Sequence, residues 1–286
     1  MGVKVVVVSD THITEQAPAF GDNWRAVRDW IGETAPEVVV HLGDITAHGV
    51  DDARELDHAR EAFDAVGREI RFVPGNHDIG DSPCAPDRPS EHPLDWNRLA
   101  HYRKIFGPDR WSLPLGSWRL VGLDAQLFGT ASAEEQEQFA WLDETVRQHR
   151  GPLGVMLHKP LFRDDPAETI AHVRYVPAAP RRRLLDCLAG CDLRFVASGH
   201  AHQARRLRVG SIEHAWAPSL AYRIPDAVQE RIGEKVVGVL ALELDEAGHR
   251  FEVVVPDGVI QHDLADHPHL YHEIGARQRP NGFAAL

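Results

Sequence analysis

Five short motifs in this sequence combine residue types that bind metal ions. Their potential ligands are two carboxylates, one amide oxygen and four imidazoles, with no thiolate among them. Such a mixed set of nitrogen and oxygen donors suits Mn²⁺, Fe²⁺, Zn²⁺ or Co²⁺ better than a structural zinc site or a calcium loop. The seven residues are Asp10, His12, Asp44, Asn76, His158, His200 and His202.

Seven ligands exceed what one metal ion needs once positions are left open for water. A carboxylate can bridge two ions that lie about 3.5–4 Å apart, which resolves the excess. The residue types therefore predict a centre of two divalent metal ions, drawn from Mn, Fe, Zn or Co.

The first 75 residues alternate apolar runs with amphipathic stretches. Short Val-rich or Ile-containing runs at Val3–Val8, Glu37–Leu42 and Ile70–Val73 predict buried strands. Apolar residues at helical spacing predict helices at Asn23–Glu33 and Asp51–Val66. The order β-α-β-α-β is typical of a layered α/β domain.

The rest of the chain continues with strands, helices and two irregular stretches, at 79–96 and 159–180. No linker or internal repeat interrupts it, so residues 1–286 are predicted to form one domain. The expected helices are Ala133–His149 and Leu184–Ala189; the expected strands are Trp118–Asp124, Leu153–Leu157, Leu193–Ala197, Arg205–Val209, Ile212–Trp216, Val236–Leu244 and Phe251–Val255.

Each of the five motifs follows a predicted strand. In open α/β sheets, ligands bind at the carboxyl ends of the strands. The ordered set D-x-H, G-D, G-N-H-D, H and G-H-x-H, from Asp10 to His202, resembles the calcineurin-like metallophosphoesterase superfamily. The resemblance implies a four-layer α/β/β/α sandwich with two mixed β-sheets, in which residues from about 205 to 286 complete the second sheet and could form a cap or a dimer edge.

The resemblance also implies a role for each motif residue. Asp44 would bridge the two ions, and His77 would lie outside the metal shell, against the phosphoryl group or the leaving oxygen. The remaining six would divide into Asp10, His12 and His202 for the first metal and Asn76, His158 and His200 for the second. Two divalent ions lower the pKa of a bridging water and stabilise charge on phosphoryl oxygens, while a histidine can protonate the leaving group.

One departure from the pattern concerns the partner of His77. A protonated imidazole beside two metal ions needs a nearby carboxylate to orient it and to hold its pKa up. Many relatives place an Asp three residues after the bridging Asp, and this chain has Ala47 there. Asp78 or Asp51 could substitute.

Other departures from the family motifs indicate which branch of the superfamily this chain resembles. The Ser/Thr protein phosphatases have the motifs G-D-x-x-D-R-G and G-N-H-E, whereas this chain has Ala47 three residues after the bridging Asp44 and has Asp78 directly after His77. Purple acid phosphatases need a tyrosinate three residues after the bridging Asp, and Ala47 stands at that position in this chain. What remains resembles the bacterial cyclic nucleotide and glycerophosphodiester phosphodiesterases. Those relatives often read H-H-P-P where this chain has His158-Lys159-Pro160-Leu161.

The predicted function is hydrolysis of a small phosphodiester, a 3′,5′-cyclic nucleotide or a glycerophosphodiester, by a metal-bridging hydroxide. Asp44 and His77 are the predicted catalytic residues, and Asn76, His77, Lys159 and His172 are the candidates for substrate binding. A phosphomonoesterase or a nuclease could use the same ligands, and a non-catalytic scaffold could keep the fold.

The formal net charge of −12 disfavours a long nucleic acid or an anionic membrane as the partner. No apolar run approaches the roughly 18 residues of a membrane span, and the N-terminus lacks a secretory leader. Three cysteines form no disulfide framework. These features predict a cytoplasmic protein, and a homodimer remains open.

Overall fold

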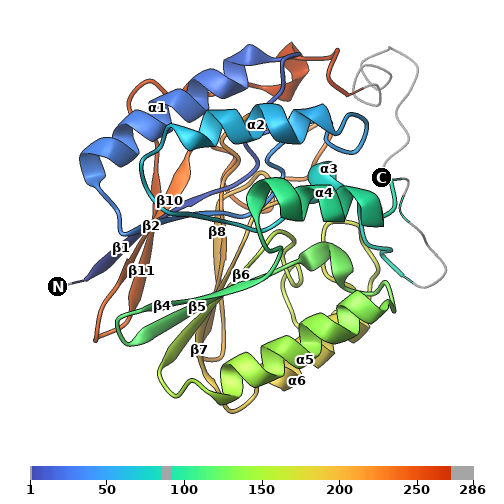
Figure 1. The fold of residues 1–286 in the computed structure, drawn as a ribbon, viewed down its shortest axis with the longest axis vertical. Helices are drawn as coiled ribbons and strands as arrows, with labels where there is room; N and C mark the ends of the chain where they lie inside the picture. The colour runs from blue at the N-terminus through green and yellow to red at the C-terminus, as the bar shows by residue number, and fades with distance from the viewer. Residues whose placement is uncertain (1, 86–89, 91, 272–286) are drawn as a thin grey trace.

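The structure is a computed structural model of the 286-residue chain and describes residues 2–85, 90 and 92–271. The described residues contain eleven strands, which form two sheets that face each other (Figure 1). Among the described residues, no helix combines the length and the apolar character that crossing a membrane requires.

The first sheet has five strands in the order β11-β10-β1-β2-β3. β1 (Val3–Val8), β2 (Val38–His41) and β3 (Ile70–Phe72) run parallel. β10 (Val239–Leu244) pairs antiparallel with β1, and β11 (His249–Val254) pairs antiparallel with β10.

The second sheet has six strands in the order β4-β5-β6-β7-β9-β8. The four central strands are parallel, and the two edge strands run antiparallel to their neighbours. The bounds are β4 Trp111–Leu115, β5 Trp118–Leu123, β6 Pro152–Leu157, β7 Asp192–Ser198, β8 Arg205–Val209 and β9 Ile212–Trp216.

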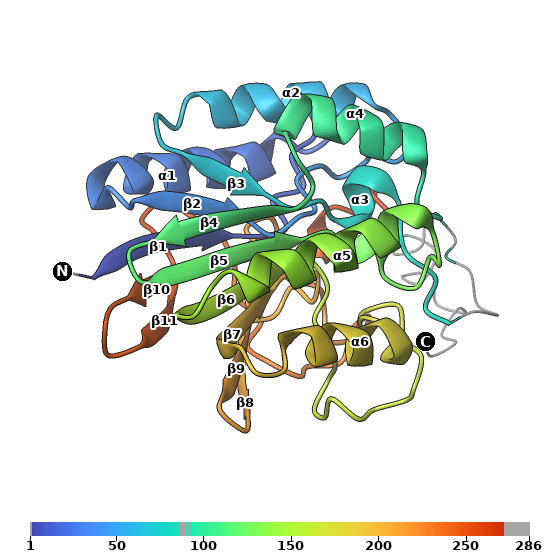
Figure 2. The same cartoon turned by 60° about the horizontal axis from the view of Figure 1, so that its bottom comes forward.

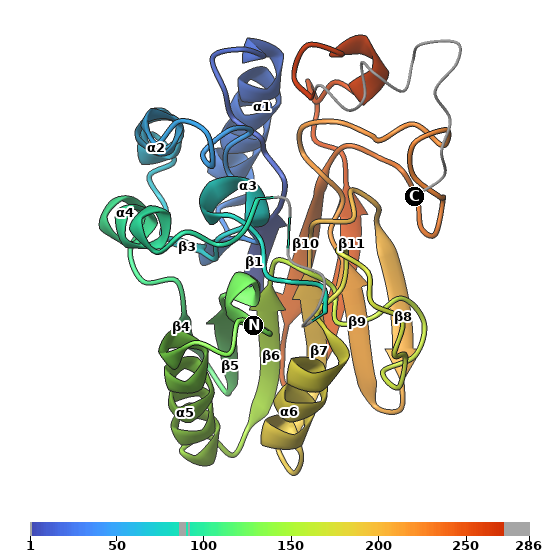
Figure 3. The same cartoon turned by 90° about the vertical axis from the view of Figure 1, so that its right-hand side faces the viewer.

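Helices cover the outer face of each sheet, which gives the predicted four-layer sandwich (Figure 2). α1 (Pro18–Thr34), α2 (Arg54–Asp64) and α4 (Trp96–Phe106) pack on the first sheet. α5 (Ala133–Arg147) and α6 (Ala178–Leu188) pack on the second, at the opposite end of the molecule from α1 and α2 (Figure 3). Three short helices complete the fold: α3 (Asn76–Ile79), η1 (Ala125–Leu127) and η2 (Leu264–Asp266).

The valines of β1 show why this strand lies in the middle of the molecule. Val6 and Val8 pack toward the helices of the first layer, whereas Val5 and Val7 pack between the two sheets against side chains such as Phe195. Successive side chains on a strand point to opposite faces, so a continuous Val run fits a strand that is buried on both faces.

Residues after 205 divide between the two sheets, which corrects the expectation that they complete the second sheet. β8 and β9 extend the second sheet, but β10 and β11 extend the first. β1 would otherwise be an exposed edge, and Leu240, Leu242 and Leu244 of β10 fill the core between the sheets.

Besides the short helices α3, η1 and η2, the elements α4 and β4 were not predicted. The α4 helix follows directly on the stretch predicted to be irregular, of which residues 86–89 and 91 lie outside the described part. β4 contains Pro114, which argues against a central strand and is tolerated here because β4 is an edge.

Asn23 on α1 predicts a measurable contribution to stability. Its buried amide donates to the carbonyls of Leu220 (3.0 Å) and Ile260 (2.9 Å) and accepts from the Ile260 N–H (2.8 Å). Asn23→Ala leaves these backbone groups unpaired, so we expect the free energy of unfolding to fall by about 2–3 kcal/mol in urea denaturation. Asn97→Ala, at an exposed position of α4, is the control and should change it by less than about 0.5 kcal/mol.

Candidate metal centre

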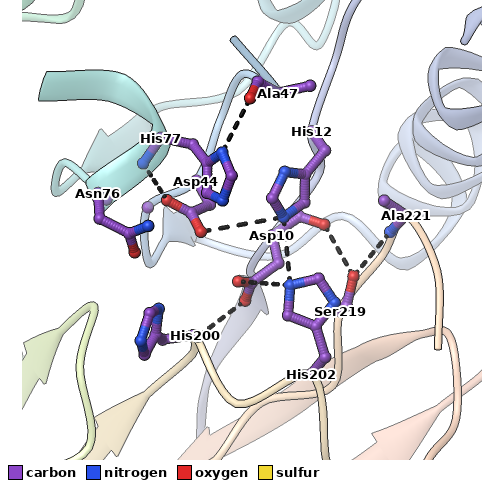
Figure 4. A network of polar contacts seen from close by, with 12 residues as sticks. Asp10, His12, Asp44, Ala47, Asn76, His77, His200, His202, Ser219 and Ala221 are labelled. Atoms are coloured by element: carbon purple, nitrogen blue, oxygen red, sulfur yellow. Dashed lines mark hydrogen bonds and ion pairs between the residues drawn. The ribbon is translucent and has the colours of Figure 1, made fainter. Parts of the chain in front are cut away.

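The five polar motifs meet at the carboxyl ends of their strands. Figure 4 shows residues of four of these motifs, and His158 lies beside Asp44 and Asn76. Two groups of side chains could each hold a metal ion, and within each group the potential ligand atoms lie within 4.8 Å of one another. Asp44 belongs to both groups. The first group is Asp10, His12, Asp44 and His202; the second is Asp44, His158 and His200.

Asp44 lies between the two groups. Its Oδ2 is 3.3 Å from Nε2 of His158 and 3.9 Å from Nε2 of His12, while its Oδ1 accepts from the backbone N–H of His77 at 2.9 Å. Asn76 joins the second group, because its Oδ1 lies 3.1 Å from Nε2 of His158. One carboxylate oxygen therefore faces imidazoles of both groups, as a bridging ligand requires.

The backbone at this site is unusual. Five of the proposed ligands have positive φ values: Asp10 (+53°), His12 (+43°), Asp44 (+50°), His200 (+62°) and His202 (+51°). Residues other than glycine seldom adopt this region, and such strain persists where the surroundings hold it. Backbone bonds between motifs do so: the Asp10 N–H donates to the Gly43 carbonyl at 3.0 Å, and the His12 N–H donates to the Asp44 carbonyl at 3.1 Å.

Two glycines allow the loops to approach this closely. A Cβ on Gly75 would lie 2.1 Å from the backbone nitrogen of Asp44, and a Cβ on Gly199 would lie 1.8 Å from Oγ of Ser9. Neither distance is compatible with a side chain at these positions. The glycines of the G-N-H-D and G-H-x-H motifs are therefore required by packing against the ligand loops.

Asp78 braces two of the loops rather than orienting His77. Its buried carboxylate accepts from the N–H groups of Ile45 (3.2 Å), Thr46 (2.9 Å) and Gly75 (2.8 Å). Nδ1 of His77 instead lies 2.8 Å from the carbonyl of Ala47. The partner of His77 is thus the Ala47 carbonyl, whereas a carboxylate was predicted. Because this contact uses Nδ1, Nε2 of His77 is left to interact with another group.

Hydrogen bonds to carbonyls also fix the tautomers of two proposed ligands. Nδ1 of His158 lies 2.7 Å from the Leu42 carbonyl, and Nδ1 of His202 lies 3.2 Å from the Tyr222 carbonyl. A carbonyl only accepts, so each Nδ1 carries a hydrogen, and Nε2 is the nitrogen left to coordinate a metal ion. Both Nε2 atoms face the groups described above.

Several polar atoms of the site face one another at short distances. Nε2 of His12 lies 3.2 Å from Nε2 of His202, and Nε2 of His158 lies 3.1 Å from Nδ1 of His200. Within the described part of the chain, Oδ1 of Asp10 is buried and receives no hydrogen bond, although Nε2 of His202 is 3.2 Å away. Imidazole nitrogens that face one another and a buried carboxylate oxygen without a hydrogen bond fit divalent cations between them.

Burial keeps two of these imidazoles, His12 and His200, neutral and hence able to coordinate. It lowers the pKa of His12 and of His200 well below the ordinary histidine value. At His158 burial also acts to lower the pKa, but the neighbouring Asp44 outweighs it and raises the pKa to about 9. A metal ion that binds His158 must therefore displace a proton.

His41 lies beneath the bridging loop. Its Nδ1 accepts from the Gly43 N–H at 3.1 Å, and its Nε2 contacts Oγ1 of Thr11 at 3.0 Å. Burial lowers its pKa to about 3, so the ring is neutral and ties the D-x-H loop to the G-D loop.

Two of the predicted substrate-binding residues lie outside the metal groups. Lys159 is buried, forms an ion pair with Asp81 and donates to Oγ of Ser82 at 3.2 Å. His172 is half-buried, and its Nδ1 accepts from the Arg174 N–H at 3.0 Å. A role for either residue in substrate binding stays a prediction.

Tyr222 and Tyr271, which were not predicted from the sequence, border the first group. The hydroxyl of Tyr271 lies 3.0 Å from Nδ1 of His12, and the hydroxyl of Tyr222 lies 3.5 Å from its Nε2. Neither tyrosine belongs to one of the five motifs, and no local spacing singles them out.

Comparison with known proteins agrees with this geometry. A family model described as calcineurin-like phosphoesterase matches residues 3–204, which is more than half of the chain. The chain belongs to the calcineurin-like phosphoesterase family. All seven proposed ligands lie within the matched region.

Among curated proteins, this phosphoesterase is similar to the serine/threonine-protein phosphatase CPPED1 of Homo sapiens and of Pongo abelii. It is 26% identical to each over 158 residues, which cover 52% of this chain and 47% of the relative. The matched segment thus spans about half the length of those relatives.

Among solved structures, the phosphoesterase resembles a dimetal phosphatase from Danio rerio, with a TM-score of 0.59 and 15% identity over 89% of this chain and 99% of that one. It also resembles a purple acid phosphatase from yellow lupin (Lupinus luteus), with a TM-score of 0.65 and 15% identity over 100% of this chain and 57% of that one. Both share its fold.

The unsatisfied polar atoms predict that divalent metal stabilises the folded chain. Mn²⁺ at 100 times its Kd should add about 2.7 kcal/mol to the free energy of unfolding, or about 5–10 °C in Tm by differential scanning calorimetry. Because the proton on His158 competes with the metal, the gain should increase from pH 6 to pH 8.

A matched pair of variants tests where that stabilisation arises. Asp44→Asn should abolish most of the Mn²⁺-dependent rise, whereas Asp29→Asn, at an exposed carboxylate of α1, should keep it. A rise in the Asp44→Asn protein equal to that of the unaltered chain would contradict the assignment of the bridge.

Proposed function

We propose that this phosphoesterase is a phosphodiesterase that hydrolyses a small phosphodiester, such as a 3′,5′-cyclic nucleotide or a glycerophosphodiester, with two divalent metal ions. The observation that carries the proposal is the position of Asp44, whose Oδ2 faces ligands of both groups. The two ions, drawn from Mn, Fe, Zn or Co, would lower the pKa of water and neutralise charge on the phosphoryl oxygens.

The remaining roles, metal binding and access for the substrate, belong to residues of the chain itself. Asp10, His12 and His202 would hold one ion, Asn76, His158 and His200 would hold the other, and Asp44 would serve as a ligand of both. Asn76, His77 and His200 are half-exposed, in contrast to the buried residues of the first group. The substrate would therefore approach from the side of the second ion, where His77 is accessible.

His77 is placed to protonate the leaving oxygen. Its backbone N–H holds Asp44 and its Nδ1 is bonded to the Ala47 carbonyl, so the ring is held beside the bridge with Nε2 directed elsewhere. A histidine in this position can supply a proton to the departing alkoxide.

The preference for a diester is supported by the local charge. Lys159, which directly follows His158, is compensated by Asp81 within the protein. A diester carries one negative charge, whereas a monoester carries close to two at neutral pH. A site in which this neighbouring cation is already paired favours the less charged substrate.

A phosphomonoesterase on the same site is the second candidate. The curated relatives are named as serine/threonine-protein phosphatases, which supports it. The motifs around Ala47 and Asp78 differ from the pattern of that class, as described above.

Turnover of two chromogenic esters separates the candidates. On metal-stripped protein reloaded with Mn²⁺, we expect kcat/KM for bis(p-nitrophenyl) phosphate to exceed that for p-nitrophenyl phosphate by about tenfold or more, a difference of about 1.4 kcal/mol in transition-state stabilisation. Asp44→Asn should abolish both activities and Asp29→Asn neither. A preference for the monoester would establish the phosphatase instead.

The role of His77 predicts a dependence on the leaving group. His77→Gln should slow hydrolysis of a diester with an alkyl leaving group by about 10²–10⁴-fold, because an alkoxide needs a proton. It should slow the p-nitrophenyl diester much less, since p-nitrophenolate leaves unprotonated. Equal losses on the two substrates would show that His77 acts only through substrate binding or through Asp44.

A further inference from the structure

The C-terminal part of the described chain returns to the metal centre. Residues 260–271, here called the C-terminal strap, run beside the first turns of α1 (Figures 1 and 3). The buried side chains of Leu264 and Leu270 pack with Phe20 and Tyr222. This apolar cluster holds the strap against the turn that follows β9.

Hydrogen bonds fix the strap at both ends. Ile260 exchanges two bonds with the side chain of Asn23, and the Leu264 N–H donates to the Arg223 carbonyl at 2.9 Å. Near the far end, Nε2 of His269 lies 3.2 Å from the carbonyl of Gln16. These bonds therefore hold Tyr271, the last residue of the strap, in a defined position.

Tyr271 lies beside His12. The hydroxyl of Tyr271 lies 3.0 Å from Nδ1 of His12, and its ring stands edge-on to the rings of His77 (5.4 Å between centroids) and His12 (6.3 Å). Nε2 of His12 faces His202 and Asp44. If Nε2 binds the metal, Nδ1 must carry the hydrogen and donate it to the Tyr271 oxygen.

Tyr222 supports this arrangement from the other side. Its hydroxyl donates to the Tyr271 oxygen at 3.1 Å. The Tyr271 oxygen thus accepts from both Tyr222 and His12, and its position is set by two partners. The two tyrosines lie beyond residue 204, where the match to the family model ends.

We propose that Tyr271, carried by the C-terminal strap, is a positioning residue that holds His12 in the tautomer and orientation needed to bind the first metal ion. The proposal rests on the proposed function of the same site. The C-terminal strap is then part of the metal centre, although the Tyr271 hydroxyl acts on the ion only through His12. The proposal also explains why Asp10, His12, Asp44 and His202 are buried while the second group is partly open.

Metal binding, measured without any turnover, tests the proposal. Titration calorimetry with Mn²⁺ on metal-stripped protein should resolve two sites in the unaltered chain. Tyr271→Phe keeps the ring and removes the hydroxyl, so affinity at one site should fall by about 10-fold or more, in the range found for outer-shell partners, and the other should be unchanged. Tyr222→Phe should weaken the same site by a smaller factor.

Tyr102→Phe is the matched control, since the Tyr102 hydroxyl of α4 is buried between the helices and the first sheet and has no hydrogen-bond partner among the described residues. It should leave both affinities unchanged. Long-range ¹H–¹⁵N NMR of the metal-free chain gives a second readout: His12 should be the Nδ1–H tautomer, and Tyr271→Phe should shift it toward Nε2–H.

The outcomes separate this proposal from the function on which it rests. Equal affinities in the unaltered chain and Tyr271→Phe would overturn the role of Tyr271. Equal losses at both sites, with a lower Tm, would also overturn it, by showing that the residue only holds the strap in place. An unaltered chain that binds fewer than two ions would overturn the proposed function itself.

Discussion

Two buried carboxylates and four imidazoles converge at one end of the two sheets, where imidazole nitrogens face one another and one carboxylate oxygen of Asp10 receives no hydrogen bond from the described residues. Bringing such groups out of water is costly unless a partner compensates them. In the metal-free chain, Asp44 raises the pKa of His158, so a proton supplies part of that compensation. Divalent cations would supply the rest, and the strained backbone at five ligands is tolerated because the loops are bonded to one another.

Residues that hydrogen-bond to the loops carrying the proposed ligands determine the shape of the site. Asp78 and His41 join the loops after β1, β2 and β3, so that the bridge, Asn76 and the D-x-H motif keep a common frame. The contacts of Asp78 with Thr46 and of His41 with Thr11 join segments that are separated in sequence. The result is a first metal group that is buried and a second that borders the surface, which gives the substrate one side of approach.

The C-terminal third shows how the sheets and the site depend on each other. β10 covers the edge of β1, the strand that leads into Asp10 and His12, and the turn after β9 carries Ser219, whose hydroxyl donates to the Asp10 carbonyl at 3.0 Å. The strap then packs on that turn. The region after residue 204 is thus attached to the D-x-H loop from two directions.

The resemblance of the motifs to a known family implied the four-layer sandwich. The sequence alone predicted metal-ligand residue types after the strands and a layered α/β order, because residue type and local periodicity are visible without the fold. It did not determine that β10 joins the first sheet, since period-two patterning marks a strand but not its neighbour. The Ala47 carbonyl as the partner of His77, the pairing of Lys159 with Asp81 and the position of Tyr271 beside His12 were decided only by the tertiary structure. Each is a contact between side chains or loops far apart along the chain, and such contacts leave no spacing that a sequence can show.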